Sequence, residues 1–163
     1  EFHARFSSKG KRYLYRIYNS PQRDIFRRNY VYQVSEPLDI DAMRKAAAHI
    51  VGEHDFAGFM SQGSTPQEST VRTVYSLSVT KTPESGDAAL ITVAIEGSGF
   101  LYNMVRIITG TLVEVGLHKR TPESVALAVK QADRSLAGHT APPQGLYLDE
   151  VFYDSADFAP LNQ

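Results

Sequence analysis

The sequence predicts an α+β fold in which an antiparallel sheet carries helices packed on one face. Residues 71–80 and 89–95 both alternate apolar and polar side chains across a turn, which indicates an antiparallel hairpin. Residues 100–116 are apolar on nearly every side at helical period, which indicates a buried helix. Strands followed by a helix occur twice, an order typical of α+β layers. With 163 residues and 42% hydrophobic content, the chain is expected to form one domain with a substantial core.

The first elements follow from alternation and capping. Residues 11–19 alternate and predict a strand, and residues 29–34 predict a second, shorter extended segment. A helix is expected over residues 39–51, because Asp39 can accept a backbone hydrogen bond at its start and Gly52 can end it.

The later elements are predicted from residues that interrupt regular structure and from a helix-capping residue. Residues 55–70 are rich in Gly, Pro and Ser and predict a long loop, a kind of segment that is more often functional than not. Thr121 as cap and Pro122 at the first helical position predict a helix to about residue 132. Residues 145–153 predict a last strand.

Arg106 is the unusual side chain of the apolar helix. It and Glu114 are the only charged residues between Gly97 and Leu117. Buried arginines are almost always paired, so Arg106 is expected to meet an anion, either a carboxylate of the protein or part of a substrate. The alternative is a helix edge from which Arg106 extends to solvent.

The net charge of −1 hides an asymmetry along the chain. Residues 1–34 hold eight Lys/Arg against Glu1 and Asp24, whereas residues 35–163 carry a net charge of −7. Aromatic residues are interleaved with the cations of the first segment. This combination suits nucleic acid, because cations meet phosphates and rings stack on bases. An edge strand with ordinary solubilising charge is the alternative.

The sequence lacks the motifs of several common kinds of functional site. The five histidines are scattered and cysteine is absent, so neither a metal site nor a disulfide framework is expected. No phosphate-binding loop motif or nucleophile elbow occurs. Gly97-Ser98-Gly99 before a helix is consistent with a phosphate site, and also with a tight strand-to-helix turn, which we favour. No run of apolar residues has the length of a membrane span, and no signal peptide is visible.

Four segments in order resemble one family. They are Phe2-His3-Ala4-Arg5-Phe6-Ser7 with Lys11-Arg12-Tyr13-Leu14-Tyr15-Arg16-Ile17; Gly52-Glu53-His54-Asp55-Phe56 with Val71-Arg72-Thr73-Val74; Gly99-Phe100-Leu101-Tyr102-Asn103-Met104-Val105-Arg106 through Gly116; and Gly145-Leu146-Tyr147-Leu148. This set resembles the C-terminal half of the TruA-type tRNA pseudouridine synthases, over nearly the whole chain.

The resemblance implies a cofactor-free isomerase that converts uridine to pseudouridine in the anticodon stem-loop of tRNA (tRNA positions 38–40). It also implies a cytoplasmic homodimer, with two α+β halves that share one sheet and a basic cleft. The target base is flipped from its stack before an aspartate attacks as nucleophile.

The resemblance assigns roles to individual residues. Tyr13 matches the family's active-site tyrosine, which lies against the target base. Arg106 matches the basic residue that pairs with the catalytic aspartate. Lys9, Lys11, Arg12 and Arg16 are expected to line the tRNA cleft, although no motif fixes them individually.

The family's nucleophile motif, of the type Gly-Arg-Thr-Asp-Ala-Gly-Val-His, has no counterpart in these 163 residues. Residues 1–163 are therefore expected to be a C-terminal domain that is inactive alone, with an N-terminal domain that supplies the aspartate. A non-catalytic RNA-binding module and a dimerisation domain remain as alternatives.

Overall fold

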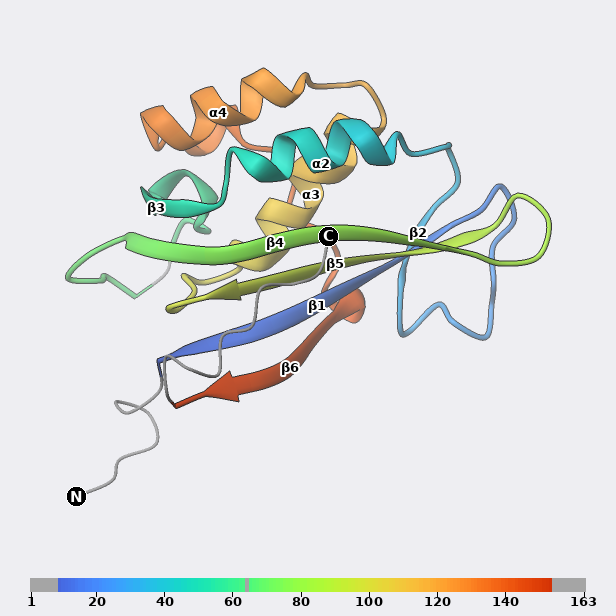
Figure 1. Ribbon diagram of the computed structural model, residues 1–163, viewed down its shortest axis with the longest axis horizontal. Helices are drawn as coiled ribbons and strands as arrows, with labels where there is room; N and C mark the ends of the chain where they lie inside the picture. The colour runs from blue at the N-terminus through green and yellow to red at the C-terminus, as the bar shows by residue number, and fades with distance from the viewer. Residues whose placement is uncertain (1–8, 64, 154–163) are drawn as a thin grey trace.

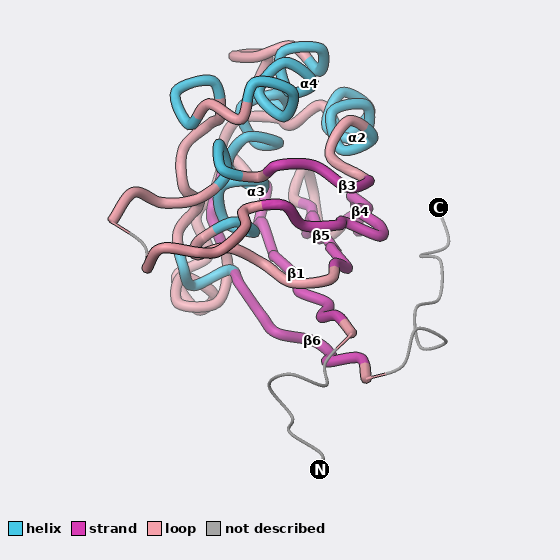
Figure 2. The backbone as a smooth tube through the Cα atoms, turned by 90° about the vertical axis from the view of Figure 1, so that its left-hand side faces the viewer, coloured by secondary structure: helices cyan, strands magenta, loops and turns pink. Residues whose placement is uncertain are grey.

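The computed structural model describes residues 9–63 and 65–153. The first motif of the resemblance, at residues 2–7, lies outside the described residues. Within them, six strands form one sheet, and three α-helices lie on the same side of it (Figure 1). Figure 2, seen along the sheet, shows the two layers. The predicted α+β class, with helices on one face of the sheet, is confirmed.

The sheet is built around β1, Gly10–Asn19, which pairs with β5, Ala89–Gly97, over nearly its whole length. β5 pairs with β4, Val71–Pro83, and β4 pairs with β3, Gly52–Asp55. These three pairings are antiparallel, as the sequence predicts.

The other edge of β1 is shared by two strands. β6, Leu146–Phe152, pairs antiparallel with its first half, and β2, Tyr32–Val34, pairs parallel with its last three residues. A parallel neighbour needs a longer connection than a hairpin turn, and residues 20–31 supply it. The parallel pairing of β2 departs from the expected antiparallel arrangement.

Two helix starts are where the sequence places them. α2 is Ile40–Ala48, and the Asp39 carboxylate accepts a hydrogen bond from the Ala42 N–H. α4 is Pro122–Gln131, and the Thr121 side chain accepts one from the Ser124 N–H. α2 ends at Ala48, earlier than predicted, because Gly52, at φ +116°, already begins β3.

The buried helix is α3, Met104–Gly116. Ile107, Ile108 and Leu112 are fully buried in it. Each such side chain contributes about 1.5–3 kcal/mol to the free energy of folding. The prediction that this helix begins at residue 100 was wrong for its first turn, because Asn103 has a left-handed φ of 61° that interrupts the helix before Met104.

Two details of the remaining strands and loops differ from expectation. The alternation of β4 is broken by a bulge between Val74 and Ser76, which buries Val74 and leaves Tyr75 42% exposed. The predicted loop 55–70 contains a short 3-10 helix, η1, at Ala57–Phe59. Two further 3-10 turns, η2 at Arg134–Leu136 and η3 at Pro143–Gly145, follow α4.

Candidate active site

Arg106 lies in the first turn of α3 and is partly buried. Its Nε–H donates to the carbonyl oxygen of Ala141 at 2.7 Å, and its Nη1 donates to Oδ1 of Asn103 at 3.0 Å. Both acceptors are neutral. No carboxylate within residues 9–63 and 65–153 pairs with this guanidinium. A guanidinium carries five N–H donors, so Arg106 is held in place with donors left for an anion.

Asn103 connects Arg106 to the loop that follows β3. Its Nδ2 donates to Oγ of Ser61 at 2.9 Å, while its Oδ1 receives Arg106. The Ser61 N–H donates in turn to the carbonyl oxygen of Tyr102 at 3.2 Å. The left-handed backbone of Asn103, which Asn tolerates better than most residues, aims its amide along this chain of bonds. Sequence reasoning missed Asn103 and Ser61 as neighbours of Arg106.

Residues 138–142 form a segment that lies along α3, and we call it the strap. The Ala141 N–H donates to the carbonyl oxygen of Arg106 at 3.0 Å, so the two residues exchange hydrogen bonds. The Gly138 N–H donates to Oγ1 of Thr111 at 2.8 Å. Gly110 permits this approach, since a Cβ there would overlap the carbonyl oxygen of His139. The strap can therefore lie this close to α3 only because residue 110 has no side chain.

The other end of the strap is held by a side-chain cluster. Glu114 accepts from the backbone N–H of His139 at 2.6 Å, and its Oε2 lies 2.8 Å from His139 Nδ1. Arg120 donates to the same carboxylate at 3.1 Å. Burial alone would raise the pKa of Glu114, but the hydrogen bonds from His139 and Arg120 outweigh it and the pKa is lowered.

Two tyrosines of β1 face this region. Tyr15 is fully buried and its hydroxyl donates to the carbonyl oxygen of Pro142 at 2.6 Å, which ties β1 to the strap. Its burial raises its pKa strongly, with a further increase from Tyr32, whereas the positive charge of Arg106 acts in the opposite direction. Arg106 thus lies within electrostatic reach of this strand.

Tyr13, two residues earlier on the same side of β1, is half-buried, and its ring meets Phe100 edge to face at 5.2 Å. Burial raises the pKa of its phenol, so the hydroxyl keeps its proton at neutral pH. The structure places Tyr13 and Arg106 on the same side of the sheet, without direct contact between them.

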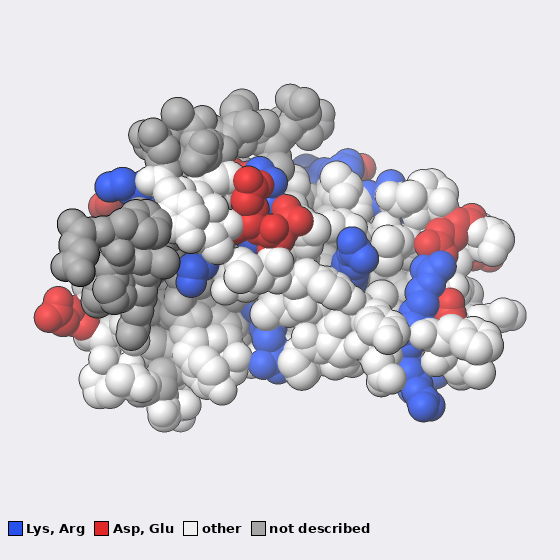
Figure 3. Space-filling view, turned by 90° about the horizontal axis from the view of Figure 1, so that it is seen from below, with Lys and Arg blue, Asp and Glu red and all other residues white. Residues whose placement is uncertain are grey.

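The four predicted RNA-binding residues are not brought together. Lys9 precedes β1, and Lys11 has the same parity as Tyr13 and shares its side of the strand. Arg12 and Arg16 alternate with them and lie on the side without helices. Seen from that side, the molecule shows cations separated by white and red atoms, with no continuous basic surface among the atoms that the structure describes (Figure 3).

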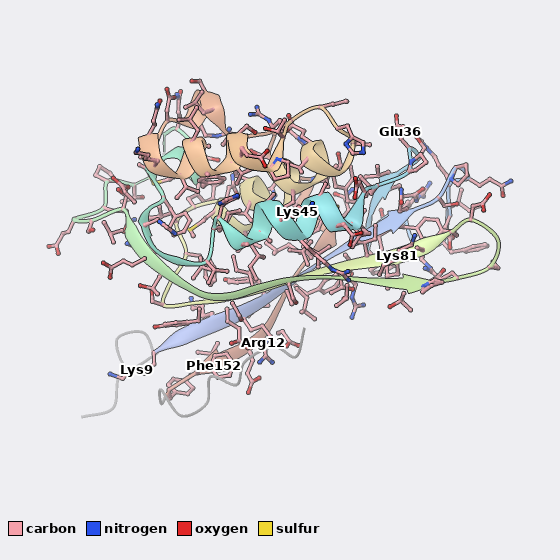
Figure 4. The ribbon with its side chains drawn as sticks, turned by 45° about the horizontal axis from the view of Figure 1, so that its top comes forward. Lys9, Arg12, Glu36, Lys45, Lys81 and Phe152 are labelled. Atoms are coloured by element: carbon pink, nitrogen blue, oxygen red, sulfur yellow. The ribbon has the colours of Figure 1, made fainter. Side chains whose placement is uncertain are left out.

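The charge of Arg12 is already compensated within the protein. It is bonded to Glu96, which is only 1% exposed, and its Nη1 lies 3.1 Å from Glu150 and 3.4 Å from Asp149. Its guanidinium also lies over the ring of Phe152, at 5.3 Å from the centroid (Figure 4). Arg16 lies similarly over Tyr147, at 5.0 Å. The guanidinium of Arg12 is thus engaged within the protein, and its contact with tRNA stays a prediction.

Neither a metal centre nor a membrane-spanning helix occurs in the part of the chain that the structure describes. No cluster of three or more His, Cys, Asp or Glu side chains there has the arrangement of a metal site. No helix in the same residues is long and apolar enough to cross a membrane.

Comparison with known proteins adds the family to this geometry. Residues 46–154 match the family model described as tRNA pseudouridine synthase. The chain is 52% identical over 152 residues to the tRNA pseudouridine synthase A of Brevibacillus brevis. It is 47% identical over 154 residues to that of Geobacillus sp. WCH70, and 45% identical over 154 residues to that of Bacillus subtilis. These alignments cover 93–94% of this chain and 60% of each relative.

The chain belongs to the TruA-type tRNA pseudouridine synthase family. The part that matches the family model contains Arg106, Asn103 and the whole strap, and it begins after Tyr13. The chain spans about 60% of the length of the tRNA pseudouridine synthases that it matches.

Proposed function

We propose that this chain supplies Arg106 and Tyr13 to an active site that isomerises uridine to pseudouridine in the anticodon stem-loop of tRNA. The observation that carries the proposal is the arrangement around Arg106. Its guanidinium is fixed by two neutral oxygens and retains donors for an anion that the described residues do not supply. In the proposed enzyme that anion is the nucleophilic aspartate, which comes from a segment outside these 163 residues.

The reaction needs no cofactor in its atom balance, because uridine and pseudouridine are isomers. The bond between N1 of the base and C1′ of the ribose breaks, and a bond between C5 and C1′ forms. The proton on C5 leaves, and N1 gains one. A carboxylate nucleophile divides this exchange into steps through a covalent intermediate.

Arg106 has a definite task in this scheme. A guanidinium next to a carboxylate favours its ionised form and fixes its orientation through charge-assisted hydrogen bonds. The anchors at Ala141 and Asn103 pre-position the guanidinium before the aspartate arrives, which lowers the cost of organising the site.

Tyr13 has a different task. Its half-buried ring is packed on Phe100 and offers an apolar surface against which a flipped base can stack. A phenol with its ordinary pKa of about 10 carries its proton at neutral pH, and burial, which raises the pKa of Tyr13, keeps it neutral there. We assign it to contact with the target base and to assistance in proton transfer.

The test uses the chain joined to the additional segment that its relatives carry. Unmodified tRNA labelled with tritium at C5 of uridine releases the label as the new carbon–carbon bond forms. Arg106→Ala should abolish release while tRNA affinity stays largely intact, and Arg106→Lys should recover only a small part of it, because Lys lacks the planar fork. Near-normal release from Arg106→Ala would refute the assignment.

The resemblance also implies a cytoplasmic homodimer, and we include both in the proposal. Sedimentation of the joined protein tests the homodimer. If the joined protein binds tRNA without release of tritium, a non-catalytic RNA-binding role replaces the enzymatic one.

A further inference from the structure

The connection between β1 and β2, residues 20–31, exposes large apolar side chains at its tip. Ile25 is 67% exposed, Phe26 86% and Tyr30 60%. A single exposed apolar residue is ordinary, but three within one connection of twelve residues are not, and exposed apolar side chains that gather in one region mark interaction sites.

Hydrogen bonds and ion pairs to neighbouring residues fix the conformation of this connection. The Asp24 N–H donates to Oε1 of Gln33 at 3.2 Å, and Gln33 Nε2 donates back to the Asp24 carbonyl oxygen at 2.8 Å. Arg27 bonds to Glu84 at 2.9 Å and to Asp24 at 3.2 Å, and it also lies over the ring of Tyr18. Phe26 is therefore presented by a pre-organised turn, which reduces the entropy that binding would cost.

Arg23 and Arg28 differ from Arg27 in exposure and in ion pairing. Both are exposed, and neither has a carboxylate partner among the residues that the structure describes. Figure 3 shows blue side chains, with red ones beside them, at the end of the molecule where this connection lies. In the sequence, these two arginines lie on either side of the exposed Phe26, and neither has an ion-pair partner in the described residues.

A cavity of about 470 Å³ lies between this connection and the turn that joins β4 to β5. Arg23, Asp24, Ile25 and Phe26 line it from the connection, and Ser85, Gly86 and Asp87 line it from the turn. The carboxylate of Asp24 is paired with Arg27. The volume is in the range of small-molecule sites, which runs from about 300 to 1,000 Å³.

We propose that this cavity is a second nucleotide-binding site, in which an unpaired base stacks on Phe26 and its neighbouring phosphates meet Arg23 and Arg28. Aromatic rings beside cations are the usual platform for single-stranded nucleic acid. The centres of protein–protein interfaces are instead depleted in charge, so exposed arginines beside the ring favour a nucleic acid over a second copy of the chain.

The site lies at the opposite end of β1 from Tyr13. The strand rises about 3.3 Å per residue, so Asn19 is about 20 Å from Tyr13 along it. The second site must therefore contact a nucleotide other than the target uridine. That this nucleotide belongs to tRNA rests on the proposed function.

The chain contains no tryptophan, which permits a direct test. In Phe26→Trp the only indole reports stacking, and addition of a single-stranded uridine oligonucleotide should quench its fluorescence. Leu127→Trp, on α4, is the control and should show no quenching. A folded state is verified for each variant by circular dichroism.

Affinity for unmodified tRNA completes the test. Phe26→Ala should weaken binding about 5- to 150-fold, as the stacking of one base predicts, with the salt dependence unchanged. The plot of log affinity against log salt concentration has a negative slope. In the double variant Arg23→Gln/Arg28→Gln this slope should become shallower, by about 0.7–0.9 for each phosphate that is no longer neutralised. Lys130→Gln on α4 is the matched charge control.

The outcomes separate this site from the proposed function. Quenching of Phe26→Trp by the oligonucleotide, with no binding of tRNA to the unaltered chain, supports the site and overturns the tRNA assignment. Normal tRNA affinity in all variants, with no quenching, overturns the site and leaves the proposed function standing. A change in sedimenting mass of Phe26→Ala without a change in tRNA affinity also overturns the site, because the patch then serves self-association.

Discussion

At the scale of single residues, Tyr13 and Arg12 are close in sequence and differ in what holds them. Tyr13 has a ring contact with Phe100 and its hydroxyl has no hydrogen-bond partner among the described residues. Arg12, one residue away and on the opposite side of the sheet, is bonded to three carboxylates. Tyr13 thus keeps a hydroxyl for the substrate contact that we propose, whereas the guanidinium of Arg12 is engaged within the protein.

Tyr13→Phe therefore tests chemistry more than structure. We expect it to leave the melting temperature nearly unchanged and to lower kcat for tritium release by about 10²- to 10⁴-fold if the hydroxyl transfers a proton. KM for tRNA should change little. Equal losses in kcat and in affinity would instead indicate that the hydroxyl only positions the base.

Arg12→Ala tests the opposite expectation. It leaves Glu96, which is 1% exposed, without its guanidinium. Removal of one partner of a buried pair costs on the order of 3 kcal/mol in the free energy of unfolding. Urea denaturation of the variant measures this, with Arg16→Ala as control, which removes only the stacking on Tyr147 and should cost about 0.5–1 kcal/mol. Combined Arg12→Leu/Glu96→Leu should restore much of the stability; a double variant no more stable than Arg12→Ala would argue against the buried pair.

At the scale of elements, α3 and the strap act as one unit, because backbone and side-chain bonds join them along about two turns of the helix. Arg106, Thr111 and Glu114 each bond to the strap. The orientation of the guanidinium of Arg106 thus depends on a segment 35 residues later in the chain.

Gly110→Ala should disturb this unit. The new methyl group would overlap the carbonyl oxygen of His139, and such overpacking costs about 1–3 kcal/mol. We expect a lower melting temperature together with a reduced kcat, since the strap supplies the Ala141 acceptor. Gly99→Ala is the matched control, because its methyl group would make an ordinary contact with Arg72 at 3.6 Å. If both variants behave alike, close packing at residue 110 is not required.

Acid should weaken the hold of Glu114 on the strap. The folded pKa of Glu114 is lowered, so its bonds to His139 and Arg120 stabilise the protein fully above its ordinary value of about 4.5. That contribution is lost as the pH falls through the folded pKa. We expect Glu114→Gln to destabilise the protein by about 1–3 kcal/mol at neutral pH and to flatten the pH dependence of stability below about pH 4.5. Parallel pH profiles for the variant and the unaltered chain would contradict this.

The helix caps show how far local sequence predicts elements. Asp39 and Thr121 mark their helix starts because a cap is a contact over three residues. β3 was not predicted because Gly52-Glu53-His54-Asp55 lacks apolar alternation, and only its pairing with β4 makes it a strand. The late start of α3 escaped prediction because the left-handed backbone of Asn103 has no counterpart in helical periodicity.

The candidate site was predictable only in part, because contacts between residues far apart in the chain leave no local sequence signal. Arg106 stands out as a cation on an apolar helix, and the expectation that it meets an anion comes from that apolar surrounding. Its acceptors Ala141 and Asn103 do not stand out, because a backbone carbonyl 35 residues away leaves no sequence signal. Likewise, the carboxylates around Arg12 lie 84 to 138 residues from it, so composition alone did not predict these ion pairs.

At the scale of the whole molecule, the described part of the site lacks an anion and the chain spans about 60% of its relatives' length. We predict that this chain alone releases no tritium from labelled tRNA, even in excess over the substrate, while the joined protein does. Release by the chain alone would show that one of its own nine aspartates is the nucleophile.

The position of β1 has a consequence for how the protein is made. β1 leaves the ribosome before the other strands of its sheet, yet one of its edges is completed by β6 only after residue 146 and its successors have been synthesised. Contacts between such distant segments slow folding, and an unpaired strand edge is a template for wrong partners. Synthesis that stalls before residue 146 would release a chain in which β1 can pair with β5 and β2 but the edge of its first half has no partner. The yield of native protein should therefore depend on chaperones that shield this edge until β6 is made.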